Sequence, residues 1–555
     1  MMPQATTFVA LFCGCGGFTL GMLRAGLRCL AAVDSSREAI ATLEANLVHR
    51  RHADFEPPMH ALEKDLTRFS PQDLSALLGT QRVDVIVGGP PCQGFSTVRQ
   101  RDGSNHGTIR LKEDTRRHLY RCFLDYVEFF QPSVFVIENV LGLRTAVGGS
   151  YFTAIQHEAR ILGRSSGRVG YRVHAQIEEA PRLGVPQKRR RQLIFGVRND
   201  LPGYFPSELA PARRAVLGVT LGDAIGDLPV LVAGAGQHLR DYDLGRRHDF
   251  LQGRRGHVRR HYLFEVLEAG STRQLANHVA RPHSARDLRD FALLPEGTSS
   301  AEMMRAGVEF EFPYDKTSFK DRYTRQHRNR PCSTIVAHLS KDGLMFIHPT
   351  QNRSLTPREA ARVQSFPDWF EFPRARTHAF RLVGNAVPPL VAESVGLAVR
   401  AFLASCHRPE RSRTEREHCS VGPLPTSIVE ANGWLAIVAA KRVHQLRRTP
   451  REEFLRAWHA LLWLLPELHP DSALDHGEEV VETCAFTDPL PLLDRRFLRS
   501  GWPVALELVG REAWRRFEIG ELSDETFYCV AAQVAGLNHR AAAKFGGHCG
   551  GSEIK

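Results

Sequence analysis

Short uninterrupted apolar runs alternate with helix-periodic segments along the first two hundred residues of the chain. Runs such as VDVIV are typical of strands that are buried on both faces of a parallel sheet. The strand-like runs lie at residues 8–12, 29–34, 83–89, 133–140 and 191–198. The helix-like segments between them lie at residues 18–26, 36–47 and 118–132. This alternation predicts an α/β fold, with a doubly wound and mostly parallel sheet that binds ligands at the carboxyl ends of its strands.

The periodic pattern fades after residue 204, where glycines, prolines and arginines are scattered, and returns after residue 330. Thr356 followed by Pro357 is typical of a helix start, and an Asn-Ala-Val-Pro-Pro turn precedes a long apolar helix within residues 383–403. We therefore predict that residues 1–204 and 331–403 form one sheet domain. The irregular residues 205–330 are then a domain inserted into it.

The last 150 residues have a different character. Residues 404–425 are charged and carry prolines, so we expect a linker, and residues 426–555 predict a mainly helical C-terminal extension of unknown role. The apolar runs of this extension are too short to span a bilayer and fit helix core faces better. Its Cys and His residues match no common zinc-finger spacing, so we expect no metal site.

Composition bears on partners and on the compartment. The chain of 555 residues has a formal net charge of +12, which favours a polyanionic partner, nucleic acid ahead of a membrane surface. Arginines are densest at residues 245–262; isolated, such a run is usually a solvated loop, but with the overall charge we expect it to face nucleic acid. Eleven cysteines without a repeating frame indicate reduced thiols, and the first residues lack a signal-peptide pattern. A cytoplasmic protein with no membrane segment is therefore expected.

A glycine-rich turn, LFCGCGGF at residues 11–18, follows the first predicted strand. Gly14 and Gly16 fit the start of a dinucleotide fingerprint, but Thr19 occupies its third glycine position. Asp34 ends the second predicted strand, twenty residues after Gly14, a spacing that suits an acid binding ribose hydroxyls. Together with Asp65, these residues predict an adenosine-type cofactor without specifying which one.

Three further groups lie where predicted strands begin or end. Cys92, in GGPPCQGFS, follows one strand; most cysteines are inert buried thiols, but the flanking glycines and prolines fix an unusual backbone around this one. No histidine neighbours Cys92, which argues against a protease. Glu138 closes an apolar strand, where a carboxylate is costly without a partner. Arg189 and Arg191 share one face of a strand; in isolation this would be a solvated basic edge.

The order of these stretches resembles a known family. LFCGCGGF, AAVD, KDL, GGPPCQGFS, IENV, VPQKRRR, REAARVQSFP and GNAVPP follow one another as the motifs of DNA (cytosine-5)-methyltransferases do, from residue 8 to about 402. The resemblance implies an S-adenosylmethionine-dependent, Rossmann-like methyltransferase with its target-recognition domain at residues 205–330. It assigns catalytic roles to Cys92, Glu138, Arg189 and Arg191. It assigns cofactor-binding roles to Phe12, Gly14, Gly16, Gly17, Asp34, Asp65, Pro91 and Asn385.

The resemblance also implies a mechanism. The Cys92 thiolate would attack carbon 6 of a cytosine flipped out of duplex DNA, while Glu138 holds the N3 and N4 edge of the ring. Arg191 would contact the O2 side, and Arg189 would anchor the thiol loop and Glu138. The expected enzyme is a monomeric DNA (cytosine-5-)-methyltransferase of a bacterial or archaeal restriction–modification system, nucleoid-associated, with a cognate endonuclease acting separately.

Two alternatives remain open. Some proteins with these motifs methylate tRNA at the same carbon, so a tRNA methyltransferase fits the same residues. A catalytically silent protein that only occupies DNA sites is the second alternative, although the presence of Cys92, Glu138 and Arg191 argues against it. A separate class of RNA methyltransferases uses a cysteine within the Glu-Asn region, which reads VIENVLG here and contains none.

Overall fold

The computed structural model describes residues 5–50, 52, 54–91, 119–145, 149–162, 169–201, 205–206, 208–253, 255–312, 323–341 and 343–406. Cys92, the residues that follow it up to residue 118, and the C-terminal extension lie outside the described residues. The chain divides into two compact units. The first, comprising Met1–Tyr171, Ala175–Arg198 and Glu208–Leu403, contains nearly everything below.

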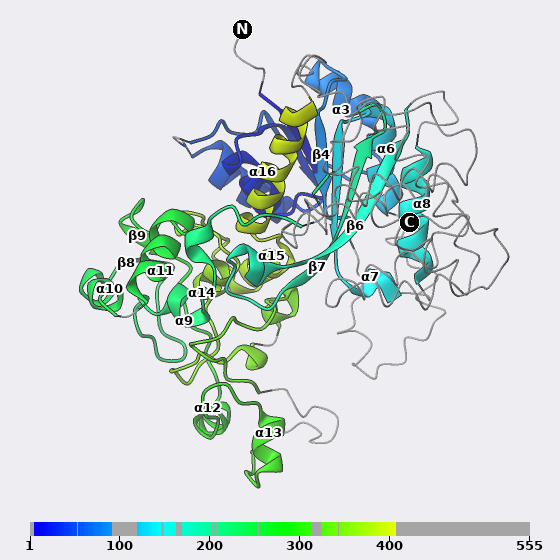
Figure 1. Ribbon diagram of the computed structural model, residues 1–555. Helices are drawn as coiled ribbons and strands as arrows, with labels where there is room; N and C mark the ends of the chain where they lie inside the picture. The colour runs from blue at the N-terminus through cyan, green and yellow to red at the C-terminus, as the bar shows by residue number, and fades with distance from the viewer. Residues whose placement is uncertain are drawn as a thin grey trace, which may run out of the picture. The chain divides into compact units, whose positions relative to one another are not determined.

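A seven-stranded sheet forms the centre of the first unit, with the strand order β3-β2-β1-β4-β5-β7-β6 (Figure 1). Its strands are β1 Thr7–Leu11, β2 Arg28–Asp34, β3 His60–Glu63, β4 Val85–Gly88, β5 Val134–Asn139, β6 Tyr171–Glu179 and β7 Arg190–Arg198. The first five run parallel to their neighbours, and β7 pairs antiparallel with β5. The predicted doubly wound, mostly parallel sheet is confirmed.

Helices cover both faces of this sheet (Figure 1). They are α1 Gly17–Arg24, α2 Arg37–Leu43 with the π-helical turn η1 Glu44–Val48, α3 Pro71–Leu78, α6 Leu119–Phe130, α7 Gly142–Thr145, α8 Ser150–Ile161, α15 Arg376–Asn385 and α16 Pro389–Cys406. The predicted cap of α2 is Ser36, whose side chain accepts from the amide of Ala39. Helices α1 and α16 pack closely, because a Cβ on Gly21 would lie 2.4 Å from Ala392 Cβ.

The segment Arg376–Cys406 is long and apolar enough to cross a membrane, but 83% of its most apolar window is buried inside the protein. It comprises two helices, α15 and α16, separated by the Pro-Pro turn. We therefore interpret it as core.

Beyond β7 the chain forms a region that we call the second lobe, residues 221–312 and 323–372. Its elements are α9 Leu221–Ile225, β8 Leu239–Asp241, α10 Leu244–Leu251, α11 Gly256–His261, η6 Tyr262–Val266, β9 Gln274–Ala276, α12 Ala285–Ala292, α13 Ser300–Arg305, η7 Ala337–Ser340, η8 Leu344–Phe346 and α14 Pro357–Val363. The two strands form a sheet of their own. Thr356 caps α14 and Pro357 is its first residue, as predicted.

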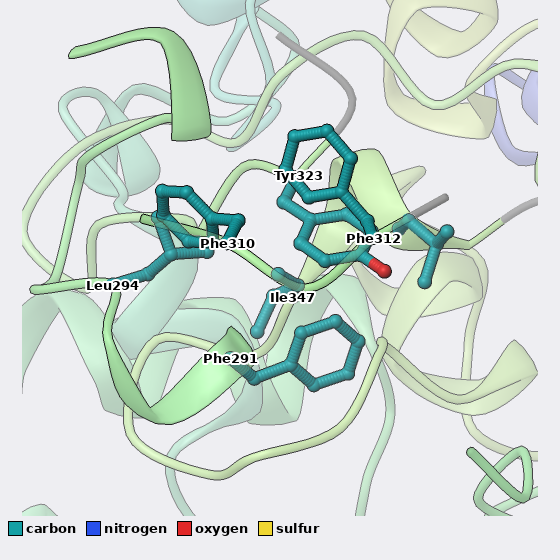
Figure 2. Close-up of a cluster of buried hydrophobic side chains, with 7 residues drawn as sticks. Phe291, Leu294, Phe310, Phe312, Tyr323 and Ile347 are labelled. Atoms are coloured by element: carbon teal, nitrogen blue, oxygen red, sulfur yellow. The ribbon is translucent and has the colours of Figure 1, made fainter. Parts of the chain in front are cut away.

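The outer part of the second lobe has its own hydrophobic core (Figure 2). Aromatic rings dominate it: Phe291 meets Tyr323 edge-on with ring centroids 5.4 Å apart, and Phe312 meets Tyr323 at 5.1 Å. The cluster consists of Phe291, Leu294, Phe310, Phe312, Tyr323, Leu344 and Ile347. This cluster joins residues from both sides of the predicted domain boundary at residue 330. The domain boundaries themselves stay predictions.

Candidate active site

The predicted site residues gather at one edge of the sheet. Asp34 and Glu138 end or nearly end parallel strands, and Phe12 directly follows β1. Because β7 is antiparallel to β5, its beginning, with Arg191, lies at the edge where β5 ends. Ligand sites of doubly wound sheets lie at this edge.

Glu138 and Arg191 form an ion pair at this edge. Arg191 Nε lies 3.0 Å from Glu138 Oε1, and the two side chains are 16% and 11% exposed. Among the described residues, Glu138 Oε1 has no hydrogen bond of good geometry although it is buried. The pair is therefore largely desolvated, and the carboxylate keeps hydrogen-bonding capacity for a ligand.

The Gly-Gly-Pro-Pro turn passes directly beside this carboxylate. A Cβ on Gly88 would lie 2.3 Å from the carbonyl oxygen of Leu11, so only glycine lets β4 approach β1 so closely. A Cβ on Gly89 would lie 3.4 Å from Glu138 Oε2, and Asn139 Nδ2 donates to the carbonyl of Pro90 at 3.4 Å. The half-buried Pro91 follows, so the chain leading to Cys92 is held beside Glu138.

The glycine-rich turn and Asp34 form a second, polar corner of the edge. Asp34 Oδ2 accepts from the amide of Gly14 at 2.9 Å, and Asp34 Oδ1 accepts from the amide of Ser36 at 2.9 Å. Burial raises the pKa of Asp34 above its usual value, although these amide donors act in the opposite direction. Gly14 has a φ of +56°, and a Cβ there would meet nothing within 4 Å. The turn therefore leaves open space beside an acid, which fits an adenosine ribose.

The structure also describes other predicted cofactor residues, among them Phe12, Gly17, Asn385 and Asp65. Phe12 has a φ of +50°, and a Cβ on Gly17 would lie 2.3 Å from the carbonyl oxygen of Val387. This close approach joins the glycine-rich turn to the GNAVPP stretch, where Asn385 is exposed at the end of α15. Asp65 is also exposed, and its Oδ1 accepts from the amide of Thr67 at 3.0 Å. These residues fit an adenosine-type cofactor; their assignment to one remains a proposal.

Arg189 lies elsewhere than its predicted role suggests. It is 2% exposed, and its guanidinium donates to the carbonyls of Ile335 at 3.1 Å and Ala386 at 3.0 Å. Among the described residues it makes no hydrogen bond to Glu138. Any contact with the Cys92 loop would involve residues outside those described. Arg190 points away and pairs with Glu179, as the predicted alternation requires.

The contacts of the arginine-rich tract at residues 245–262 differ from the expectation that this tract faces nucleic acid. Arg246 donates to the carbonyls of Leu228 and Gly226, and Arg247 binds Asp227 at 3.1 Å. Both Arg255 and Arg259 bind the buried carboxylate of Asp223, which a sequence window cannot reveal because Asp223 lies 32 or more residues away. Most of this tract therefore holds α9, α10 and α11 together and does not present free guanidinium groups to nucleic acid.

The described cysteines near the edge are poor nucleophiles. Burial raises the pKa of Cys15 to about 12 and raises the pKa of Cys13 well above its usual value. Cys332, in the second lobe, is also buried. None of these thiols competes with Cys92 for a catalytic role.

Comparison with known proteins agrees with this geometry. The family of C-5 cytosine-specific DNA methylases matches residues 6–400. The chain belongs to this family. It is 33% identical over 401 residues to the type II methyltransferase M.DdeI of Desulfomicrobium norvegicum, covering 70% of this chain and 86% of that protein. It is 30% identical over 456 residues to the type II methyltransferase M.AgeI of Thalassovita gelatinovora, covering 71% and 99%.

A solved structure supports the fold assignment. A crystal structure from E. coli, described as a DNA modification methyltransferase encoded within a prophage, superimposes with a TM-score of 0.53 at 25% identity. The match covers 72% of this chain and all of that one. Membership in this family identifies the chain as a DNA cytosine-5 methyltransferase. Residues beyond about 400, including the C-terminal extension, lie outside the family match.

Proposed function

We propose that this protein methylates carbon 5 of cytosine in a specific duplex DNA sequence, with Cys92 as nucleophile, as the modification enzyme of a restriction–modification system. The observation that carries the proposal is the desolvated Glu138–Arg191 pair beside the Pro90–Pro91 turn. The type II methyltransferases among the relatives support the biological setting.

The proposed chemistry begins with the thiolate of Cys92. Carbon 5 of cytosine is a poor nucleophile until a group adds at carbon 6, and sulfur adds there readily because it is soft and partly ionised. As the new bond forms, negative charge builds on the ring. Glu138 is placed to hold the N3 and N4 edge of the ring, and Arg191, 3.0 Å from Glu138, to contact the O2 side. Later loss of the carbon-5 proton expels Cys92.

The target base must leave the duplex for this to happen. Neither Glu138 nor Cys92 can reach the ring atoms inside a base-paired stack, so the nucleotide is flipped out, at about a few kcal/mol. The ion pair at the sheet edge then replaces the lost pairing partner, because a carboxylate and a guanidinium offer an acceptor and donors to the base edge.

S-adenosylmethionine, when bound, supplies an electrophilic methyl group. Asp34 would bind the ribose hydroxyls, and the open space at Gly14 would admit the cofactor close to the backbone. Asp65 and Asn385, both exposed, would contact the adenine and the far side of the cofactor. We further propose that the enzyme is a cytoplasmic monomer that associates with the nucleoid, and that its cognate endonuclease acts separately.

The test is expression of the chain in a host that lacks cytosine methylation, followed by bisulfite sequencing of the host DNA. A defined methylated sequence is expected, and Cys92→Ala should abolish it. A duplex with 5-fluorocytosine at that position should trap the protein covalently, and the Cys92→Ala variant should not be trapped. Methylation of tRNA with unmodified DNA would contradict the proposal, and so would the absence of any trapping.

A further inference from the structure

Three buried side chains form what we call the junction: Gln187, Arg189 and Gln364. Each is at most 2% exposed; Gln187 and Arg189 lie just before β7, and Gln364 directly follows α14. Gln187 Nε2 donates to Gln364 Oε1. Gln187 Nε2 also lies 3.4 Å from the carbonyl oxygen of Val363, and the remaining side-chain contacts of the junction go to backbone groups of two segments, residues 332–336 and 383–387.

The first of these, the return segment (residues 332–336), runs beside the start of β7. Gln187 Oε1 accepts from the amide of Ile335 at 2.9 Å, and Arg189 donates to the carbonyl of the same residue at 3.1 Å. Lys188 donates its amide to the carbonyl of Cys332 at 2.7 Å, and the hydroxyl of Thr334 donates to the carbonyl of Lys188. The return segment therefore links the second lobe to the strand that carries Arg191.

The second, the cofactor segment (residues 383–387), contains the predicted cofactor residue Asn385. Gln364 Nε2 donates to the carbonyl of Val383 at 2.7 Å, and Arg189 donates to the carbonyl of Ala386 at 3.0 Å. The two segments also touch directly, because a Cβ on Gly384 would lie 2.3 Å from the carbonyl carbon of Val336.

Within the part of the chain that the structure describes, Arg189 is the one side chain that donates to a backbone carbonyl in each segment. A guanidinium is planar and presents its donors in a fixed fork, so it sets the separation of the two carbonyls that it holds. A lysine in its place would keep the charge but could not hold both carbonyls in the same geometry. Among the described residues it makes no hydrogen bond to a carboxylate, and its guanidinium donates to the two backbone carbonyls.

We propose that Arg189 is a positioning residue that couples cofactor binding at the 383–387 segment to DNA binding next to the 332–336 segment. The proposal rests on the proposed function, because it takes S-adenosylmethionine and DNA as the two ligands. A ligand that orders one segment orders the other through the shared guanidinium. The second ligand then meets a smaller entropic cost, and each ligand raises the affinity for the other by the same factor.

The experiment measures this factor in the full-length protein. The affinity for S-adenosylhomocysteine, which cannot react, is titrated with and without a duplex that carries the mapped methylation sequence. The DNA affinity is titrated with and without saturating S-adenosylhomocysteine. The unmodified protein should show a factor of at least about fivefold in both directions. In Arg189→Lys the factor should fall toward one equally in both directions, while each ligand alone still binds.

The matched control is Arg190→Lys, the same substitution one residue further along β7 on a half-exposed side chain that pairs with Glu179. It should keep the full factor. If Arg189→Lys fails to fold by thermal unfolding, Gln364→Leu replaces it, because that change removes the donors to the cofactor segment and should also lower the factor.

Three results would overturn the coupling: an unchanged factor in a folded Arg189→Lys protein, an equal loss in Arg190→Lys, or independent binding of the two ligands to the unmodified protein. A protein that binds neither ligand would instead refute the proposed function. The two failures are therefore distinguishable.

Discussion

Two buried arginine–carboxylate pairs use the same chemistry in different ways. At the sheet edge, Arg191 Nε lies 3.0 Å from Glu138 Oε1, both side chains keep some exposure, and that oxygen has no well-formed hydrogen bond. In the second lobe, Arg353 donates to Glu359 Oε1 at 2.7 Å and to Oε2 at 2.8 Å, and both side chains are completely buried.

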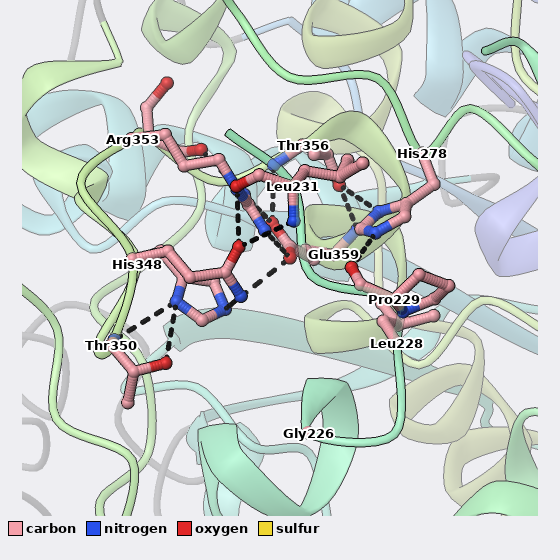
Figure 3. Close-up of polar contacts among 12 residues, drawn as sticks. Gly226, Leu228, Pro229, Leu231, His278, His348, Thr350, Arg353, Thr356 and Glu359 are labelled. Atoms are coloured by element: carbon pink, nitrogen blue, oxygen red, sulfur yellow. Dashed lines mark hydrogen bonds and ion pairs between the residues drawn. The ribbon is translucent and has the colours of Figure 1, made fainter. Parts of the chain in front are cut away.

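The surroundings of Glu359 complete the contrast (Figure 3). The amide of Thr356 donates to Glu359 Oε2 at 2.7 Å, and the His348 ring lies 3.6 Å from Oε1. His348 Nδ1 accepts from the amide of Thr350, so its other nitrogen carries the proton and faces Glu359. His278 contacts Thr356 Oγ1 at 3.1 Å and the carbonyl of Pro229 at 2.9 Å.

The difference separates a structural pair from a functional one. A buried charge whose lone pairs and protons are all used contributes to one fixed arrangement and has nothing left for a ligand. The carboxylate of Glu138 is desolvated, yet among the described residues its Oε1 accepts no well-formed hydrogen bond. This is the state expected of a group that hydrogen-bonds the edge of a substrate base. Breaking each pair should therefore damage a different property.

The largest expected effect comes from Glu359→Gln. Removing the negative charge leaves Arg353 buried without its counter-ion, so the free energy of unfolding should fall by about 3–5 kcal/mol. Denaturant titration of the variant measures this loss. The control is Glu311→Gln, whose exposed pair with Arg289 should leave the unfolding midpoint almost unchanged. A Glu359→Gln loss as small as that of the control would refute the structural role.

The corresponding change in the pair at the sheet edge is Glu138→Gln. It keeps the size of the side chain but removes the carboxyl group that hydrogen-bonds the N3 and N4 edge and can share a proton with N3 as negative charge builds on the ring, so methyl transfer should slow by about 10²–10³-fold. The unfolding midpoint should stay close to that of the unmodified protein, because the pair at the edge is not fully satisfied in the first place. Single-turnover methylation measures the rate of methyl transfer, and thermal unfolding measures the midpoint. A large loss of stability with an unchanged methylation rate would mean that the Glu138–Arg191 pair has a structural role and not a functional one.

The sequence predicts the edge pair better than the lobe pair. Strands β1, β2, β4 and β5 are uninterrupted apolar runs, and the motif resemblance places Glu138 and Arg191 at neighbouring strand ends. Strand β6 was not predicted, because YRVHAQIEE alternates polar and apolar residues and buries most of the polar ones. Strand β3 was missed because it is short and only partly buried.

The lobe could not be predicted from local patterns for a different reason. Whether an arginine is solvated or structural depends on a carboxylate far along the chain, as Arg362 with Asp227 shows over 135 residues. Arg325 lies in another arginine-rich stretch of the sequence, but it is buried and donates to the carbonyls of Leu294 and Phe291. Charge density therefore predicts the class of partner but not the side chains that contact it.

Acid should destabilise the second lobe through its buried histidines. Burial lowers the pKa of His278 to about 4 and that of His348 to about 3, against about 6.5 in the unfolded chain. Between pH 6.5 and 4 the unfolded chain binds the extra protons, so stability is full above pH 6.5 and falls as the pH drops. Each histidine contributes a slope of at most about 1.4 kcal/mol per pH unit.

Denaturant titration at several pH values from 7 to 4.5 measures this slope. His348→Gln should flatten it by about a third, because His278 and His283, whose pKa values burial also lowers to about 4, remain. His248→Gln, a change on an exposed side chain, should leave the slope as it is. A slope that does not respond to His348→Gln would show that other groups cause the acid sensitivity.

The smallest expected effect distinguishes structural from free arginines within one tract. Arg255 donates to Asp223 at 2.8 Å and to the carbonyl of Gly218 at 2.8 Å, whereas Arg260 is exposed and has no ion pair among the described residues. Arg255→Gln should lower the free energy of unfolding by about 1–2 kcal/mol. Arg260→Gln should change it by less than about 0.5 kcal/mol. Equal losses in the two variants, measured by denaturant titration at one ionic strength, would mean that partners on this surface do not decide which arginines are structural.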